Sequence, residues 1–323
     1  MRGAVAEVVR AQLFALRRYA VAVFAVLFAV ATFMGVANGI AVTSQVRVTA
    51  GELEASRGAD LSGPCNFYAE GFTFDACQAH LNTLESAQLD GTWGDPILDP
   101  VRGAARTKDT FSSPRALVSG ARLAATVLGM LALLVLLAPV VVGAVKRRPQ
   151  PLMKVYVGSR SLFLGNTVVA LVCAVGVWLT CTLGWLVGGN AWLLTSTPVH
   201  VAHSEPFLLP LATGVAAVAA VAVGISSALH FFSDAGKAFY VVPGAIIVVA
   251  VSGIIPVVRY LSPGFYLADS LGLEPREDVT PTTDYMWAPN YFGVGSGISL
   301  LVLLLVVAGL SVGAYLATQR KVG

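Results

Sequence analysis

Six long apolar stretches divide this chain, and they constrain its fold more than any other feature. Each is as long as the ~20 helical residues needed to cross a ~30 Å hydrocarbon core, or longer. Together they predict an all-α polytopic membrane protein with six transmembrane helices. The stretches are 19–43, 116–145, 161–189, 207–231, 238–258 and 293–318.

The composition agrees with a membrane protein. Hydrophobic residues make up 56% of the 323 residues and charged residues only 12%, whereas soluble domains carry about 25% charged residues. The net charge of +3 is too small to indicate a nucleic-acid partner. The positions of the charges along the chain are therefore more informative about the topology than their sum.

The segments between the apolar stretches alternate in charge. Lys and Arg concentrate in 1–18, 146–160 and 319–323, and 232–237 carries Lys237. In contrast, 44–115 holds ten acidic and six basic residues, and 259–292 holds five acidic and two basic. By the positive-inside rule, both termini are expected in the cytoplasm, and 44–115, 190–206 and 259–292 outside. The first stretch exceeds the 7–15 apolar residues of a signal peptide, so we expect an uncleaved anchor.

The four cysteines fall into two pairs with different expectations. Cys65 and Cys77 lie in the outward segment 44–115, where thiols oxidise, and we expect a disulfide between them rather than two free thiols. Cys173 and Cys181 are eight residues apart in one apolar stretch, about 12 Å along a helix, which is too far for a bridge. We expect them to be small buried packing residues.

Two further segments are expected to be structured. In 1–18, Val5, Val8, Val9, Leu13 and Leu16 gather on one helical face, although Gln12 and Phe14 break the pattern. This favours an amphipathic helix in the inner membrane interface, and the alternative is a cytoplasmic extension of the first crossing helix. Segment 44–115 is expected to form a small extracellular cap pinned by the disulfide. A short interfacial helix is expected within 259–292.

Enzyme signatures are missing from the sequence, so no catalytic residue, metal site or cofactor is predicted. The chain has no His-Glu-x-x-His, no Gly-x-Ser-x-Gly and no Gly-x-x-x-x-Gly-Lys-Ser/Thr. The group His200, His203 and Glu205 offers three ligands where a structural zinc site needs four, so we interpret it as a solvated loop. Asn166 and the few Ser and Thr residues of the apolar stretches are interpreted as helix-packing positions.

The layout resembles the integral-membrane subunit of bacterial ABC exporters, the type-2 six-helix permease family. The resemblance rests on Arg-Ala-Gln-Leu-Phe-Ala-Leu-Arg-Arg at 10–18, on the large outward segment, and on Val-Tyr-Val-Gly-Ser-Arg-Ser-Leu-Phe-Leu-Gly-Asn at 155–166, where a Ser-Arg pair precedes the third stretch. The family often has an acidic residue followed by Gly-Thr after the second crossing. Here that region reads Gly-Ala-Val-Lys-Arg-Arg-Pro at 143–149.

The resemblance implies a transport subunit of the bacterial plasma membrane that is not itself an enzyme. A separate cytoplasmic ATP-binding subunit would supply the energy, and a second permease subunit, identical or different, would complete the translocation path. The loop 146–160 would contact the ATPase. Its expected coupling residues are Leu152, Met153, Lys154, Val155, Tyr156 and Arg160.

Two other functional classes remain open from the sequence. The first is a membrane-anchored sensor or accessory subunit, in which the extracellular cap binds a ligand or partner. The second is a lipid-modifying enzyme that uses outer-loop acids, which is disfavoured because no paired carboxylates sit beside a basic clamp at the end of an apolar stretch. The transported substrate is not encoded in any recognisable motif.

Overall fold

The computed structural model describes eight α-helices and one 3-10 turn, with no strand among the residues it describes. These residues are 2–55, 111, 113–142, 158–193, 207–232, 235–252, 259–271 and 294–320. The chain divides into two compact units, which we describe separately. Unit 1 comprises Met1–Phe28, Gly120–Cys181 and Phe207–Gly323, and unit 2 comprises Ala29–Ser119 and Thr182–Pro206.

Four helices are long and apolar enough to cross a membrane, by length and composition. They are α1 (Arg2–Ala55), α8 (Ser159–Leu193), α9 (Leu208–Leu229) and α12 (Ser296–Arg320). The last three match predicted crossings closely. Many large apolar side chains on α1 and α12 are exposed, Val21, Phe33, Ile298 and Leu305 among them, as expected for helices with lipid as their solvent.

Helix α1 is continuous from Arg2, so residues 1–18 do not form a separate helix. The structure therefore has the second arrangement that the sequence left open, an extension of the first crossing helix. Its 54 residues correspond to about 80 Å, more than twice the thickness of a hydrocarbon core. The predicted apolar face is only partly buried: Val8 and Leu16 are buried, Leu13 is exposed, and Gln12 lies on the buried side.

The second predicted crossing is broken rather than a single straight helix. It consists of α4 (Ser113–Ala124) and α5 (Val127–Val141), and the pair is bent by 70°. At the break, Thr126 is extended with ψ 167°, and its hydroxyl donates to the Leu123 carbonyl at 2.6 Å. Gly129 permits the fold-back, because a Cβ there would lie 2.0 Å from the Ala124 carbonyl oxygen.

The fifth predicted crossing, 238–258, corresponds to α10 (Ala235–Ser252). This helix contains Pro243 and is shorter than the four long ones, at about 27 Å for its 18 residues. Its apolar part, Gly236–Val249, is too short to count as a crossing by itself. The number of six crossings therefore stays a prediction.

Helix α11 (Pro263–Ser270) lies within the predicted outer segment 259–292, and it is packed into the bundle. It contacts α9, α10 and α12 within unit 1. Ser262 caps it by accepting from Gly264 N at 3.1 Å, and the same hydroxyl donates to the Val249 carbonyl of α10 at 3.0 Å. Phe265 is completely buried, so the short helix exists as predicted but packs against protein.

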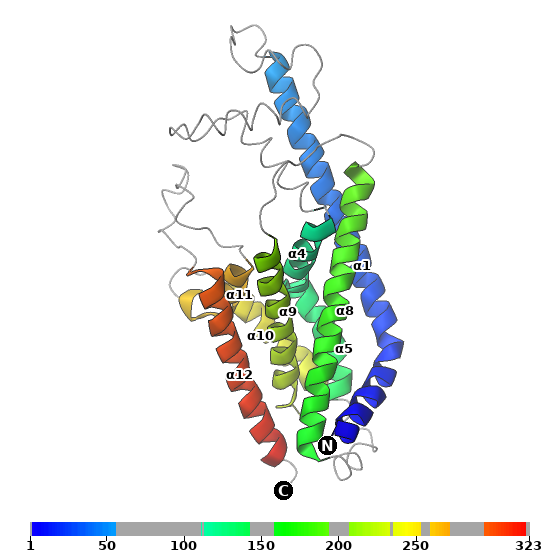
Figure 1. Cartoon of the computed structure of the whole chain (residues 1–323), viewed down its shortest axis with the longest axis vertical. Coiled ribbons are helices and arrows are strands. Elements are labelled where there is room, and N and C mark those ends of the chain that lie inside the picture. Colours follow the sequence, from blue (N-terminus) through cyan, green and yellow to red (C-terminus); the bar gives the residue numbers. More distant parts are fainter. Residues whose placement is uncertain are drawn as a thin grey trace. The chain divides into compact units, whose positions relative to one another are not determined.

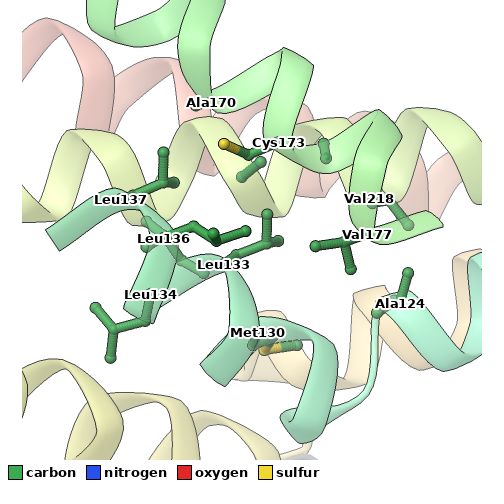
Figure 2. Packing of buried hydrophobic residues seen from close by; sticks show 14 of the residues in the cluster. Ala124, Met130, Leu133, Leu134, Leu136, Leu137, Ala170, Cys173, Val177 and Val218 are labelled. Atoms are coloured by element: carbon green, nitrogen blue, oxygen red, sulfur yellow. The ribbon is translucent and has the colours of Figure 1, made fainter. Parts of the chain in front are cut away.

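The core of unit 1 is built around α5, which is apolar on every side. Leu133, Leu134, Leu136 and Leu137 are all buried. Figure 2 shows Leu133 and Leu136 on the side of α5 that faces Cys173 of α8, while Leu134 points the opposite way. Most of α5 is buried, although Val127, Leu128 and Val135 are exposed. In lipid this burial contributes van der Waals packing rather than a hydrophobic free energy, because lipid tails are as apolar as leucine.

Specific contacts define two ends of unit 1. At one end, which we call the basic end, the start of α1 meets the start of α8 through Val8 and Gly165, and Phe231 after α9 meets Gly313 of α12. At the opposite end, Gly214 near the start of α9 lies against Ala121 and Leu271. Figure 1 shows α9 and α12 alongside each other, and they contact, with the Ser227 and Ser311 hydroxyls 2.9 Å apart.

Candidate functional site

The sequence-predicted site residues are described only in part. Cys65 and Cys77 lie outside the described residues, as do Leu152, Met153, Lys154, Val155 and Tyr156, and the group of His200, His203 and Glu205. Arg160 is described: it lies in the first turn of α8 at the basic end and is exposed. The disulfide and the coupling loop stay predictions.

Cys173 and Cys181 are free and buried, as the sequence predicts. Cys173 contributes to the apolar core beside α5 (Figure 2). Both therefore act as small packing residues.

A chain of hydrogen bonds joins three helices at the basic end, and we call it the Asn166 cluster. It consists of Gln12 on α1, Asn166 on α8, and His230 with Ser226 at the end of α9. Gln12 Nε2 donates to Asn166 Oδ1. The other two links are Asn166 Nδ2 to His230 Nε2 at 3.0 Å and His230 Nδ1 to the Ser226 carbonyl at 2.7 Å.

The partners determine where the protons lie in this cluster. A carbonyl oxygen only accepts, so His230 Nδ1 must carry a proton and donate to Ser226. With the Asn166 amide in this orientation, Nδ2 donates and His230 Nε2 accepts, which corresponds to a neutral ring. Every link then has one direction, from Gln12 through Asn166 and His230 to the α9 backbone.

Protein surrounds most of the cluster, although His230 itself is only partly buried. Gln12 is 6% exposed and Asn166 is 2% exposed. The Phe163 ring lies 5.0 Å from the His230 ring and 5.8 Å from the Tyr315 ring of α12, between centroids. Two buried oxygens of the cluster, Gln12 Oε1 and Ser226 Oγ, have no hydrogen-bond partner among the described residues. Buried polar atoms without partners cost about 1 to 3 kcal/mol each, so the site retains unused hydrogen-bonding capacity.

A second polar group, the Asp269 cluster, lies at the opposite end of unit 1. Asp269 of α11 is 1% exposed and accepts from Ser299 Oγ of α12. Arg122 of α4 donates from Nε to the Leu271 carbonyl at 3.0 Å. Because Leu271 caps the C-terminus of α11, the guanidinium lies where the helix dipole favours a positive charge. The cluster fastens α11 to α4 and α12.

Unit 2 contains a close crossing of α1 and α8 that depends on glycine. A Cβ at Gly188 would lie 2.0 Å from the Thr32 carbonyl oxygen, and one at Gly35 would lie 2.8 Å from Gly189 N. A Cβ at Gly189 would overlap the Phe111 ring, which packs on Trp185 at 5.1 Å between centroids. Such small-residue contacts are the usual way in which membrane helices approach closely.

Two members of the Asn166 cluster are recognisable in the sequence as unusual polar residues, but nothing in the sequence indicates that they contact each other. Gln12 interrupts an amphipathic face, and Asn166 is a polar residue in an apolar stretch. His230 lies within the fourth stretch, where nothing in the sequence gives it a role. A polar residue on an otherwise apolar face is the available signal, but the partners of Asn166 are 154 and 64 residues away along the chain.

The surroundings of Asp269 in the structure differ from those expected from the sequence. The sequence places it among the acids of an outer loop, but its side chain is buried and bonded to α12. No group of three or more His, Cys, Asp or Glu side chains among the described residues has metal-binding geometry.

The long apolar helices and their exposed apolar faces indicate a helical membrane protein. No protein family, curated protein or solved structure matches this chain.

Proposed function

We propose that this protein is the permease subunit of an ATP-driven exporter in a bacterial plasma membrane. The supporting observation is the packing of the start of α1 against the start of α8. Gln12 bonds to Asn166, and Val8 packs on Gly165, directly after the Ser159-Arg160 pair. Any force applied to the loop before α8 would therefore act on α1 as well.

The proposed orientation places the basic end in the cytoplasm. Exposed basic side chains from three helices gather there: Arg10, Arg17 and Arg18 of α1, Arg160 of α8 and Lys237 of α10. At the opposite end, Asp269 and Arg122 are engaged in internal hydrogen bonds. This asymmetry fits the positive-inside rule with both termini inside.

Single-cysteine labelling tests the orientation. In a background lacking the four native cysteines, Gln319→Cys is expected to react with a membrane-impermeant maleimide only after the cells are permeabilised. Leu261→Cys serves as the control, because Leu261 is 84% exposed at the Asp269 end and should react in intact cells. Reaction of Gln319→Cys in intact cells would refute the orientation.

In this proposal the energy comes from a separate cytoplasmic ATPase, and a second permease subunit completes the path. The ATPase contact is the loop that precedes α8, through Leu152, Met153, Lys154, Val155, Tyr156 and Arg160. Closure of two ATPase subunits would move this loop, and the Asn166 cluster would carry the motion to α1 and α9.

Replacing Met153 and Tyr156 together by Asp is expected to abolish co-purification of the ATPase and transport, because two charges would enter an apolar contact. The double variant Met153→Leu with Tyr156→Phe retains apolar surface and should bind the ATPase as the original protein does. Both comparisons require equal amounts of protein in the membrane fraction and equal elution profiles in size-exclusion chromatography. Undiminished co-purification of the Asp variant in folded form would exclude this loop as the contact.

A further inference from the structure

The direction of the hydrogen bonds in the Asn166 cluster depends on the charge of His230. With the ring neutral, Nε2 accepts from Asn166 Nδ2, and the Asn166 oxygen accepts from Gln12. If Nε2 gains a proton, it becomes a donor that faces the Asn166 amino group. Two donors in contact repel, so the present arrangement cannot persist around a charged ring.

The cluster has one internal way to resolve this conflict. A 180° rotation of the Asn166 amide would turn Oδ1 toward His230 and Nδ2 toward Gln12. A matching rotation of Gln12 would then present Oε1, which is buried and without a partner among the described residues, to the Asn166 amino group. The two rotations reverse the His230–Asn166 and Asn166–Gln12 hydrogen bonds, while His230 Nδ1 continues to donate to the Ser226 carbonyl.

We propose that the Asn166 cluster is a proton-binding site in which protonation of His230 reverses the amides of Asn166 and Gln12. The ligand is a single proton, bound at His230 Nε2, and the segment that responds is the start of α1. The site rests on the contacts of unit 1 and holds whether or not the protein is a permease.

Among the described side chains of the cluster, His230 is the titratable one. On α1, Glu7, Arg10, Arg17 and Arg18 are exposed, as are Arg160 on α8 and Lys237 on α10. Tyr315 of α12 contacts Phe163 and accepts from Gln319 at 2.7 Å. Asp234 follows His230 by four residues, and its side chain lies outside those described.

Nitrogen NMR of the full chain tests the proposal. The protein would be labelled with 15N-histidine, reconstituted in nanodiscs and titrated across the range in which histidine changes charge, about pH 5 to pH 8. The chain has four histidines, and loss of one set of signals in His230→Gln identifies His230. The neutral ring is expected as the Nδ1-H tautomer. A neutral Nε2-H tautomer in the unmodified protein would overturn the proposal without any further variant.

Three variants distinguish the proposed reversal of the Asn166 and Gln12 amides from a purely structural packing role of these side chains. Asn166→Leu removes the acceptor for the charged ring, so the midpoint of the His230 titration should fall by about one pH unit. Gln12→Glu offers only an acceptor to Asn166, so the midpoint should rise by a similar amount. Asn38→Leu is the control, since Asn38 bonds locally to the Met34 carbonyl, and it should leave the midpoint unchanged.

The double variant decides the mechanism. If Gln12 acts through the Asn166 amide, the rise caused by Gln12→Glu should disappear when Asn166 is replaced by Leu. A rise that persists undiminished would mean that the introduced carboxylate acts on His230 by direct charge interaction, and it would overturn the proposed amide reversal. Equal titration midpoints in all single variants would also overturn it.

Discussion

Replacing Gly188 by alanine is expected to destabilise the protein by about 3 kcal/mol, although the change adds a single methyl group. The new Cβ would lie 2.0 Å from the Thr32 carbonyl oxygen and 2.8 Å from its carbonyl carbon. These are backbone atoms of α1, so no side-chain rotation relieves the overlap. The two helices must separate, and the contacts of Gly35 and Gly189 loosen with them.

Gly309 of α12 provides the matched control. It also lies inside a long apolar helix, but a Cβ there meets nothing within 4 Å. Gly309→Ala should be neutral or stabilise the helix by up to about 1 kcal/mol, through helix propensity. Thermal unfolding in detergent, followed by size-exclusion chromatography, should show Gly188→Ala melting about 5 to 10 °C below the original protein. Equal melting temperatures for the two variants would show that the crossing is not close.

The sequence predicts the long helices well because their signal is local. About twenty consecutive apolar residues have one stable conformation in lipid, a helix in which the backbone groups hydrogen-bond to one another. The starts and ends of α8 and α9 therefore lie within a few residues of the predicted crossings. The free state of Cys173 and Cys181 follows equally simply from helix geometry.

The break between α4 and α5 is not predictable from residue types. Ala124, Ala125 and Thr126 are neither proline nor glycine, and the apolar pattern continues across them. The cause is tertiary: Arg122 donates a hydrogen bond to the Leu271 carbonyl, and most of α5 is buried in the bundle. Such contacts override local preference, and single-sequence periodicity contains no information on them.

The Asn166 cluster is not predictable from the sequence, for a similar reason. Each member is an ordinary residue in its own segment, and the site exists only when three helices meet. Its members are polar residues in apolar segments. This pattern indicates that they are unusual, but it does not indicate which residues they contact. The coupling residues of the loop before α8 rest on resemblance, and only Arg160 among them is described.

Gly129→Ala is expected to have the second largest effect, about 3 kcal/mol, because it acts on the break itself. A Cβ at this position would lie 2.0 Å from the Ala124 oxygen and 2.5 Å from its carbonyl carbon. The chain must then open the angle between α4 and α5, which draws Arg122 away from the Leu271 carbonyl. Gly244→Ala in α10 is the control, since a Cβ there meets nothing within 4 Å.

A double-mutant cycle tests whether the break positions Arg122. In the original protein, Arg122→Ala removes a charged hydrogen bond of 3.0 Å to the Leu271 carbonyl and should cost about 1.5 to 3 kcal/mol. If Gly129→Ala has already separated the pair, Arg122→Ala should cost clearly less in that background, giving a coupling of at least about 1 kcal/mol. Additive costs, measured by thermal unfolding of the four proteins, would mean that Arg122 reaches α11 regardless of the bend. In that case the 70° angle would be set by the packing of α5 alone.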